Sequence, residues 1–229
     1  MKWRRIPLAE MLTGLLIAGA GCSHPPPPQA QLGCYLSSPQ DLRRMHRVVL
    51  LELTQDSSVP PIARDMTESL FRAAQARNLF HIDQIARDDP LCRDLPLDGR
   101  GVYTIKDLMA MREALDCDAI LFGRVTHYRS YPRMQIGLYV RLLDLQNGKL
   151  VWAVEHIWDS TDKATETRIK EFFESQMRSG YEPAQWELVT QSPKAFQKFV
   201  AFEVGQTLTP SQGDTQRIRA PGDVPAARL

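Results

Sequence analysis

The sequence predicts an α/β fold: a mixed sheet of about five strands packed by about four helices. In the first half, strand-like apolar runs alternate with helical apolar stripes, and in the second half three strand-like runs follow one another directly. The 229 residues are 43% hydrophobic and 24% charged, as in a packed globular domain. Because the formal net charge is only +1, we expect no nucleic-acid partner.

The first half predicts strand, helix, strand and helix. Residues 46–54 are rich in Val and Leu without alternation, which is typical of a strand buried on both faces. Apolar residues at helical spacing in 62–77, ended by Asn78, predict the first helix, and the alternating residues 79–85 predict the second strand. After a broken loop, Thr104 is expected to cap the next helix.

The second half predicts an antiparallel meander. Strands are expected over 117–127, 134–145 and 149–158. Gly123 marks a point where the first of them bends or a neighbouring backbone comes close. The Asn147-Gly148 pair predicts a type I′ hairpin turn, in which both central residues need positive φ.

Two more helices complete the predicted fold. The first is expected to be capped by Ser160 or Thr161 and to end at Gly180. The second begins with Ser192 as its cap and Pro193 in its first turn, a position that proline favours.

The amino terminus has the pattern of a secretory signal. A positive start is followed by an apolar run over 11–20, about half the length needed to span a bilayer as a helix, and then by small residues and Cys22. In one interpretation Cys22 becomes the acylated first residue of a bacterial lipoprotein, whose lipobox the preceding residues resemble. In the other, residues 18–20 are an A-x-A site for ordinary signal peptidase, which leaves a soluble exported chain.

The chain therefore divides into four expected parts. These are a signal peptide (1–21), a proline-rich tether (22–43), an α/β periplasmic domain (44–208) and a disordered polar tail (209–229). If the lipoprotein sorting rule of enteric bacteria applies, Ser23 after the cysteine directs the anchored protein to the outer membrane.

Three cysteines remain if Cys22 is acylated. In an oxidising periplasm we expect a disulfide first between Cys92 and Cys117, although spacing does not fix the connectivity. The alternative is that these residues pack as small buried thiols.

The sequence contains no catalytic constellation and no cofactor motif. The Gly-x-Ser-x-Gly, His-Glu-x-x-His, phosphate-loop and dinucleotide patterns are all missing. His127 and His156 lie on strands expected to be neighbours, but we expect no metal site there. Glu155, beside His156, would point to the opposite face of the sheet.

A candidate partner-contact surface lies around the loop of the meander. Tyrosine and arginine are frequent anchors of protein interfaces. The proposed contact residues are Tyr128, Arg129, Tyr131, Arg133 and Arg141.

Two segments carry a family resemblance. Residues 118–125 (DAILFGRV) and 142–152 (LLDLQNGKLVW) resemble a hairpin of bacterial envelope proteins, the group of the curli-secretion lipoprotein, the penicillin-binding-protein-activator lipoprotein and the TolB amino-terminal domain. With the preceding strand, helix and strand, the resemblance covers about residues 46–160. It implies an α/β periplasmic domain used in protein contacts, and it brings no catalytic residues.

The expected function is that of a membrane-anchored periplasmic lipoprotein, a non-catalytic protein-binding assembly or regulatory factor of the cell envelope. One alternative is a subunit of an oligomeric secretion channel or surface-organelle base, with homo-oligomers. The chain is shorter than the curli channel lipoprotein and lacks clearly lipid-facing extra hairpins, which puts pore formation in doubt. The other alternative is a soluble exported protein with a ligand-binding or enzymatic role.

Overall fold

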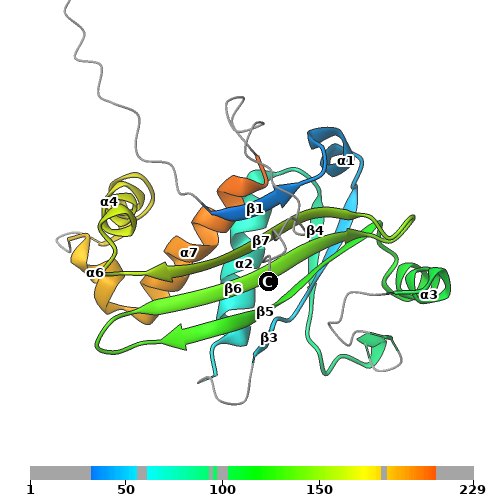
Figure 1. Cartoon of the computed structure of the whole chain (residues 1–229), viewed down its shortest axis with the longest axis horizontal. Helices are drawn as coiled ribbons and strands as arrows, with labels where there is room; N and C mark the ends of the chain where they lie inside the picture. The colour runs from blue at the N-terminus through cyan, green and yellow to red at the C-terminus, as the bar shows by residue number, and fades with distance from the viewer. Residues whose placement is uncertain (1–31, 56–60, 93–94, 97–102, 182–184, 210–229) are drawn as a thin grey trace, which may run out of the picture.

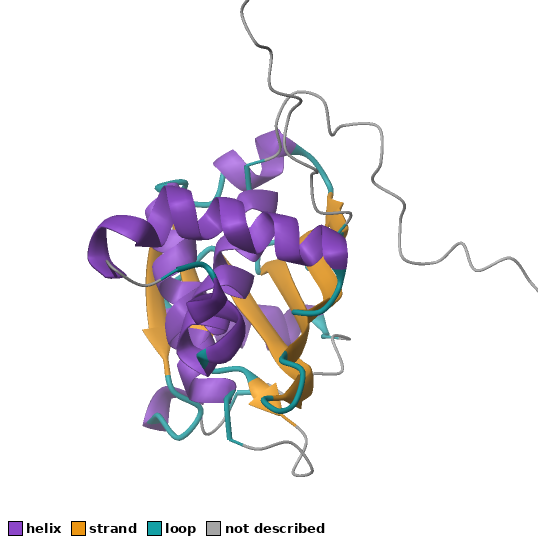
Figure 2. Ribbon diagram, turned by 90° about the vertical axis from the view of Figure 1, so that its left-hand side faces the viewer, coloured by secondary structure: helices purple, strands orange, loops and turns teal. Residues whose placement is uncertain are grey.

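The computed structural model describes residues 32–55, 61–92, 95–96, 103–181 and 185–209, which form a mixed sheet with helices on both faces (Figures 1 and 2). The predicted fold class is confirmed, with more strands and helices than expected. The expected signal peptide, Cys22 and the tail from residue 210 lie outside the described residues.

The seven strands have the order β1-β7-β6-β5-β2-β4, and β3 lies beside β5. Their bounds are β1 (Gly33–Leu36), β2 (Arg47–Leu51), β3 (Thr54–Gln55), β4 (His81–Ile85), β5 (Ala119–Arg129), β6 (Gln135–Asp144) and β7 (Leu150–Asp159).

The α-helices are α1 (Pro39–Arg43), α2 (Ala63–Arg77), α3 (Ile105–Leu115), α4 (Lys163–Phe172), α5 (Arg178–Tyr181), α6 (Glu187–Gln191) and α7 (Pro193–Thr207). A 3-10 turn, η1 (Pro90–Cys92), lies in the expected broken loop, and one π-helical segment, η2 (Phe173–Met177), joins α4 to α5.

The first half of the sheet is parallel and wound in both directions. β2 pairs in parallel with β4 on one side and with β5 on the other. Because crossovers between parallel strands are right-handed, the helices of two crossovers that run in opposite directions lie on opposite faces of the sheet. Accordingly, α2 packs into one hydrophobic cluster and α3 into another.

The second half is the predicted antiparallel meander, β5-β6-β7. The close approach expected at Gly123 is confirmed, because a Cβ atom there would lie 2.1 Å from the carbonyl oxygen of Tyr139. The predicted type I′ turn is wrong, since only Gly148 of the Asn147-Gly148 pair has positive φ. The reason is local: the Asp144 side chain accepts from the backbone N–H of Gln146, which turns the chain before Asn147 is reached.

The amino-terminal part of the described chain adds an edge strand. β1 pairs antiparallel with β7, with Gly33 opposite Glu155 and Leu36 opposite Trp152. β1 and α1 both lie within the expected tether of residues 22–43, so part of that stretch belongs to the folded sheet.

Two hydrophobic clusters fill the two faces. The large cluster lies between the sheet and α2, α4 and α7, and its most buried large side chains include Trp152, Trp158, Phe196 and Phe199. The small cluster lies between the sheet and α3, and it contains Met111 and Phe122. Figure 2 shows the helical layer against the strands.

The helix caps mostly follow the sequence. Thr104 forms a capping box with Asp107, and Ser192 caps α7 with Pro193 in the first turn, both as predicted. The cap of α4 is Asp162, whose carboxylate accepts from the backbone N–H of Thr165, and not Ser160 or Thr161. Aspartate competes well for this position because its carboxylate accepts the orphan amides and favours the positive helix end.

Candidate protein-binding surface

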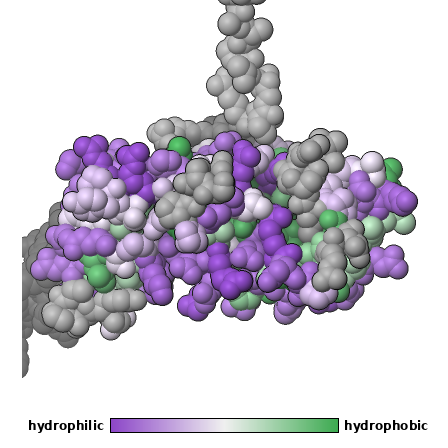
Figure 3. Space-filling view, turned by 90° about the horizontal axis from the view of Figure 1, so that it is seen from below, coloured by the Kyte–Doolittle hydropathy of each residue, from purple (hydrophilic) through white to green (hydrophobic). Residues whose placement is uncertain are grey.

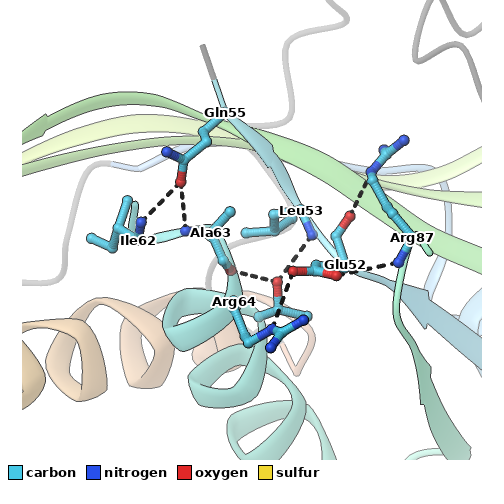
Figure 4. Close-up of polar contacts among 8 residues, drawn as sticks. Glu52, Leu53, Gln55, Ile62, Ala63, Arg64 and Arg87 are labelled. Atoms are coloured by element: carbon cyan, nitrogen blue, oxygen red, sulfur yellow. Dashed lines mark hydrogen bonds and ion pairs between the residues drawn. The ribbon is translucent and has the colours of Figure 1, made fainter. Parts of the chain in front are cut away.

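The carboxyl end of β2 lies where doubly wound sheets commonly bind ligands. Here Gln55 closes the start of α2, since its Oε1 accepts from the backbone N–H groups of Ile62 at 2.9 Å and Ala63 at 2.7 Å (Figure 4). Two amides at the N-terminus of α2 are therefore satisfied within the chain, and neither is turned toward a bound anion.

The Glu52 carboxylate at the same edge is also satisfied internally. It accepts from the backbone N–H of Arg87 at 3.2 Å and lies 3.6 Å from Nε of Arg64 (Figure 4). The Thr67 hydroxyl accepts from the backbone N–H of Leu53 at 3.0 Å and donates to the Ala63 carbonyl at 2.6 Å. These contacts tie α2 and β4 to β2, so we interpret them as structural.

The opposite edge of the parallel strands holds an open pocket of about 510 Å³. Arg47, which lines this pocket, contacts Asp83 and Asp116. The Asp118 carboxylate accepts from the backbone N–H groups of His46 and Arg47, at 2.9 and 3.1 Å. Burial alone would raise the pKa of Asp118, but these amides hold it below its usual value. At this edge, the Arg47 guanidinium and the Asp118 carboxylate are therefore satisfied within the chain.

On the second face of the meander, α3 packs beside Phe122 and Leu143, and the part around Tyr139 has no described helix against it (Figure 1). In β6, Leu138 and Val140 point into the large cluster, so Tyr139 and Arg141 point to the other face. Arg124, in the neighbouring strand β5, lies directly opposite Tyr139. We call the surface of Arg124, Tyr139 and Arg141 the open face.

Arginines and aromatic rings stack on the open face. The guanidinium of Arg141 lies 4.9 Å from the ring centre of Tyr139 and 4.8 Å from that of Phe122. The guanidinium of Arg124 lies 5.7 Å from the Tyr139 ring. Stacking on aromatic rings limits the motion of these long side chains, which lowers the entropy that a partner must remove on binding. Their planar donors suit carboxylates in particular.

The loop residues predicted as partner contacts lie elsewhere. Arg129, Tyr131 and Arg133, which we call the hairpin end, close β5 and β6, and Tyr131 is 84% exposed. Gln135, at the start of β6, lies six residues before Arg141, which is about 20 Å along a strand. The structure therefore separates Arg141 from the three residues of the hairpin end.

Tyr128 belongs to neither group. It lies opposite Ile136 and packs against the large cluster, on the face away from Arg141. On the side of the molecule seen in Figure 3, hydrophilic side chains predominate and hydrophobic ones form small separate patches.

His127 and His156 lie on opposite faces of the sheet, because they are opposite the consecutive residues Gly137 and Leu138 of β6. Nε2 of His127 lies 3.0 Å from Oε1 of Gln135. Within the described ranges, no group of three or more His, Cys, Asp or Glu side chains is arranged to hold a metal ion.

Cys92 and Cys117 are buried in the same small cluster, each as a free thiol. Burial raises the pKa of Cys117 to about 11, so its thiol stays protonated at neutral pH. The disulfide between these two cysteines stays a prediction.

The expected lipidation site, Cys22, lies outside the described residues. Among the helices that the structure describes, none combines the length and the apolar character needed to cross a bilayer.

No family model matches the sequence, and no curated protein matches it. Solved structures do. The PelC dodecamer from Paraburkholderia phytofirmans is 14% identical, with a TM-score of 0.37, and the match covers 54% of this chain and 79% of that one. Lipoprotein GNA1162 from Neisseria meningitidis is 18% identical, with a TM-score of 0.33, over 49% of this chain and 78% of that one.

LpoB from E. coli is 14% identical, with a TM-score of 0.37, and the match covers 69% of this chain and 84% of that one. The solved structures similar to this chain, at low sequence identity, thus include LpoB and a lipoprotein.

Sequence reasoning found Arg141 but missed Arg124 and Tyr139 as its neighbours. The signal was present in part, because the alternation in residues 134–145 already placed Tyr139 and Arg141 on the same, wetter face. Arg124 was missed because its place opposite Tyr139 depends on the pairing of two strands.

Proposed function

We propose that the chain is a lipoprotein of the bacterial cell envelope, anchored through Cys22 on the periplasmic side of the outer membrane, that binds another envelope protein. It acts as an assembly or regulatory factor and not as an enzyme. The observation that carries this proposal is the open face, where arginines stacked on Tyr139 stand on a part of the sheet that no described helix covers.

The stacked arginines favour a partner that presents carboxylates. The exposed guanidinium of Arg124, held against the Tyr139 ring, has in-plane N–H groups that suit bidentate binding of a carboxylate. Ile157, 57% exposed on the neighbouring strand, adds apolar area to the same face. A centre of aromatic and arginine side chains with nearby apolar area is typical of protein interfaces.

The anchor supports the same function. A diacylated Cys22 would hold the domain stably at the membrane. A target protein at the same membrane would then encounter the anchored domain at a high local concentration, so a small contact area is enough for binding. The proline-rich residues after Cys22 suit a leash.

The proposal is tested by in-cell cross-linking followed by quantitative capture of envelope proteins. The variant Tyr139→Ala with Arg141→Ala should lose at least about tenfold of the cross-linked partner, as expected when interface anchors are removed. The control is Arg72→Ala, an exposed arginine on α2 whose pair with Glu68 is not part of the open face. Equal capture by the variant and the control would overturn the open face as the binding site.

The two predicted contact groups are measured separately because they lie about 20 Å apart along the sheet. Tyr131→Ala with Arg133→Ala should leave folding intact, since Tyr131 is exposed. In parallel, the intact mass and membrane partition of the mature chain and of Cys22→Ala test the anchor. A diacylglycerol increment on Cys22 and release of the variant from the membrane are the expected results.

A further inference from the structure

The direction of β1 fixes the side on which the amino-terminal chain reaches the domain. Gly33, the first residue of β1, is opposite Glu155, and the strand then runs antiparallel to β7, toward Trp152. β7 itself runs toward Asp159, which is opposite Gln135 at the loop of the β5-β6 hairpin. The chain before Gly33 therefore enters from the hairpin side, and in Figure 1 β1 points away from that loop.

The last turn of α7 lies farther along the strands from this hairpin. Nε1 of Trp152 donates to the Thr207 hydroxyl at 3.1 Å, so α7 ends beside the start of β7. The sheet thus has two distinct ends along the strand axis, one with the amino-terminal entry and the β5-β6 loop, the other with the turn between β6 and β7.

The hairpin end carries the chemistry of a membrane-surface contact. Tyr131 is 84% exposed, and an arginine lies two residues before it and another two residues after it. Lys163, at the start of α4, is also at this end, with a side chain 92% exposed. Tyrosine prefers the headgroup region of bilayers, and arginine and lysine are attracted to anionic headgroups.

The acidic groups at this end, Asp159 and Asp162, are hydrogen-bonded within the chain but keep their negative charge. Against the effect of burial, the nearby charge of Arg133 contributes to lowering the pKa of Asp159. The Asp159 carboxylate accepts from Gln135 Nε2 at 2.6 Å and from the backbone N–H of Thr161 at 2.8 Å. The Asp162 carboxylate caps α4. Glu166 pairs with Lys163 at 3.2 Å, so this cation is partly neutralised, and the arginines of the hairpin end carry most of the local positive charge.

The reach of the chain fits a contact with the anchoring membrane. Eleven residues run from Ser23 to Gly33. At about 3.1 Å per residue in a proline-rich extended form they span up to roughly 34 Å. Gly33 pairs with Glu155, and Glu155 pairs with Tyr139. Tyr139 lies four residues, or about 13 Å along β6, from Gln135 at the hairpin loop, so Gly33 is about the same distance from that loop. The leash therefore allows the hairpin loop to touch the surface in which Cys22 is anchored.

We propose that the hairpin end (Arg129, Tyr131 and Arg133) rests on the anionic headgroups of the membrane that holds the lipidated Cys22. This inference rests on the proposed anchoring, but not on the identity of the protein partner. It orients the strands away from the bilayer, so that the open face stands sideways to the membrane, accessible to a neighbouring envelope protein.

The test uses the lipidated mature chain in vesicles of phosphatidylethanolamine and phosphatidylglycerol with brominated acyl chains. The tryptophan introduced by Tyr131→Trp should lose about half of its emission, because interfacial aromatic rings lie next to the upper acyl carbons. The matched control is Gln146→Trp, at the exposed turn on the opposite end of β6, which should not be quenched. The unsubstituted chain supplies the background of the native tryptophans.

A second measurement uses the unlipidated Cys22→Ala chain and the same lipids without bromine. Arg129→Ala and Arg133→Ala should each lower its partition onto the vesicles about fivefold, because a cation near an anionic surface contributes about that factor. Arg72→Ala is the control for an exposed arginine elsewhere and should have no effect.

The outcomes are distinct. A lipidated chain with equal, unquenched emission from both introduced tryptophans overturns this inference and leaves the proposed function intact. Loss of cross-linked protein from the hairpin variants without any change in lipid binding would assign the hairpin end to a protein partner instead. A mature chain without the acyl increment overturns the anchoring itself, and this inference with it.

Discussion

The two faces of the sheet are built differently. The face under α2, α4 and α7 is covered along nearly every strand, and Trp152, Trp158 and Phe199 are almost fully buried there. The other face is covered mainly around α3, and its remaining part over β5 and β6 presents arginine and tyrosine side chains. The comparison shows that the larger cluster is built on one face, while part of the other face, around Arg124 and Tyr139, has no described helix against it.

The clusters also differ in the polar groups that they bury. Within the large cluster, the Glu203 carboxylate accepts from Arg168 Nε at 2.7 Å and from Trp158 Nε1 at 2.8 Å. The small cluster instead buries the uncharged thiols of Cys92 and Cys117. The large cluster therefore encloses a satisfied ion pair, while the small one encloses thiols whose pKa is raised by burial.

The strongest way to break this arrangement is Glu203→Ala. The change leaves Arg168 and Trp158 Nε1 buried without their acceptor, so the free energy of unfolding should fall by about 3–5 kcal/mol. Urea denaturation measures this. The control is Glu68→Ala, which removes an exposed pair with Arg72 and should change the free energy of unfolding by less than about 1 kcal/mol. If the two changes lowered the free energy of unfolding equally, the buried ion pair would contribute no more to stability than the exposed one.

The small cluster should respond to alkaline pH. Burial raises the pKa of Cys117 from 9.0 to about 11. Between these values the unfolded chain has lost the thiol proton and the folded chain keeps it, so the free energy of unfolding falls as the pH rises. The loss should reach about 2–3 kcal/mol by pH 11. The difference between the native chain and Cys117→Ala, measured by urea denaturation from pH 8 to 11, isolates this thiol. Parallel curves for both would contradict the prediction.

Local patterns predicted most of the fold. The uninterrupted apolar run of β2 and the alternation in β6 reflect burial on two faces and on one face, and both strands lie where these patterns place them. The four residues of β1 carry no such pattern. They form a strand only because β7 offers an edge to pair with, which is a non-local effect.

The candidate site was predicted less completely. The grouping of Arg141 with the loop residues was made on nearness in sequence, and the strand between them carries the two groups apart. The stack of Arg124 on Tyr139 depends on the register of β5 with β6, which includes a bulge between Val125 and His127. Strand pairs and bulges are set by contacts between distant segments, so the sequence read locally does not reveal them.

The smallest expected effect sharpens the comparison on the well-covered face, where α7 crosses α2. A Cβ atom on Gly205 would lie 3.3 Å from the carbonyl oxygen of Ala73 and 3.5 Å from its Cβ. Alanine is favoured over glycine within a helix by about 1 kcal/mol, but the two helices would have to separate slightly. Gly205→Ala should therefore change the free energy of unfolding by less than about 1 kcal/mol.

The matched change is Ala110→Gly on the exposed side of α3, where only helix propensity acts and about 1 kcal/mol should be lost. Thermal and urea unfolding of both variants measure these changes in the free energy of unfolding. If Gly205→Ala stabilises the chain by as much as Ala110→Gly destabilises it, α2 and α7 can move apart to accept the added Cβ atom without losing packing energy. If it stabilises less, the difference measures how tightly the large cluster holds the two helices together, a constraint that the solvent-facing side of α3 does not share.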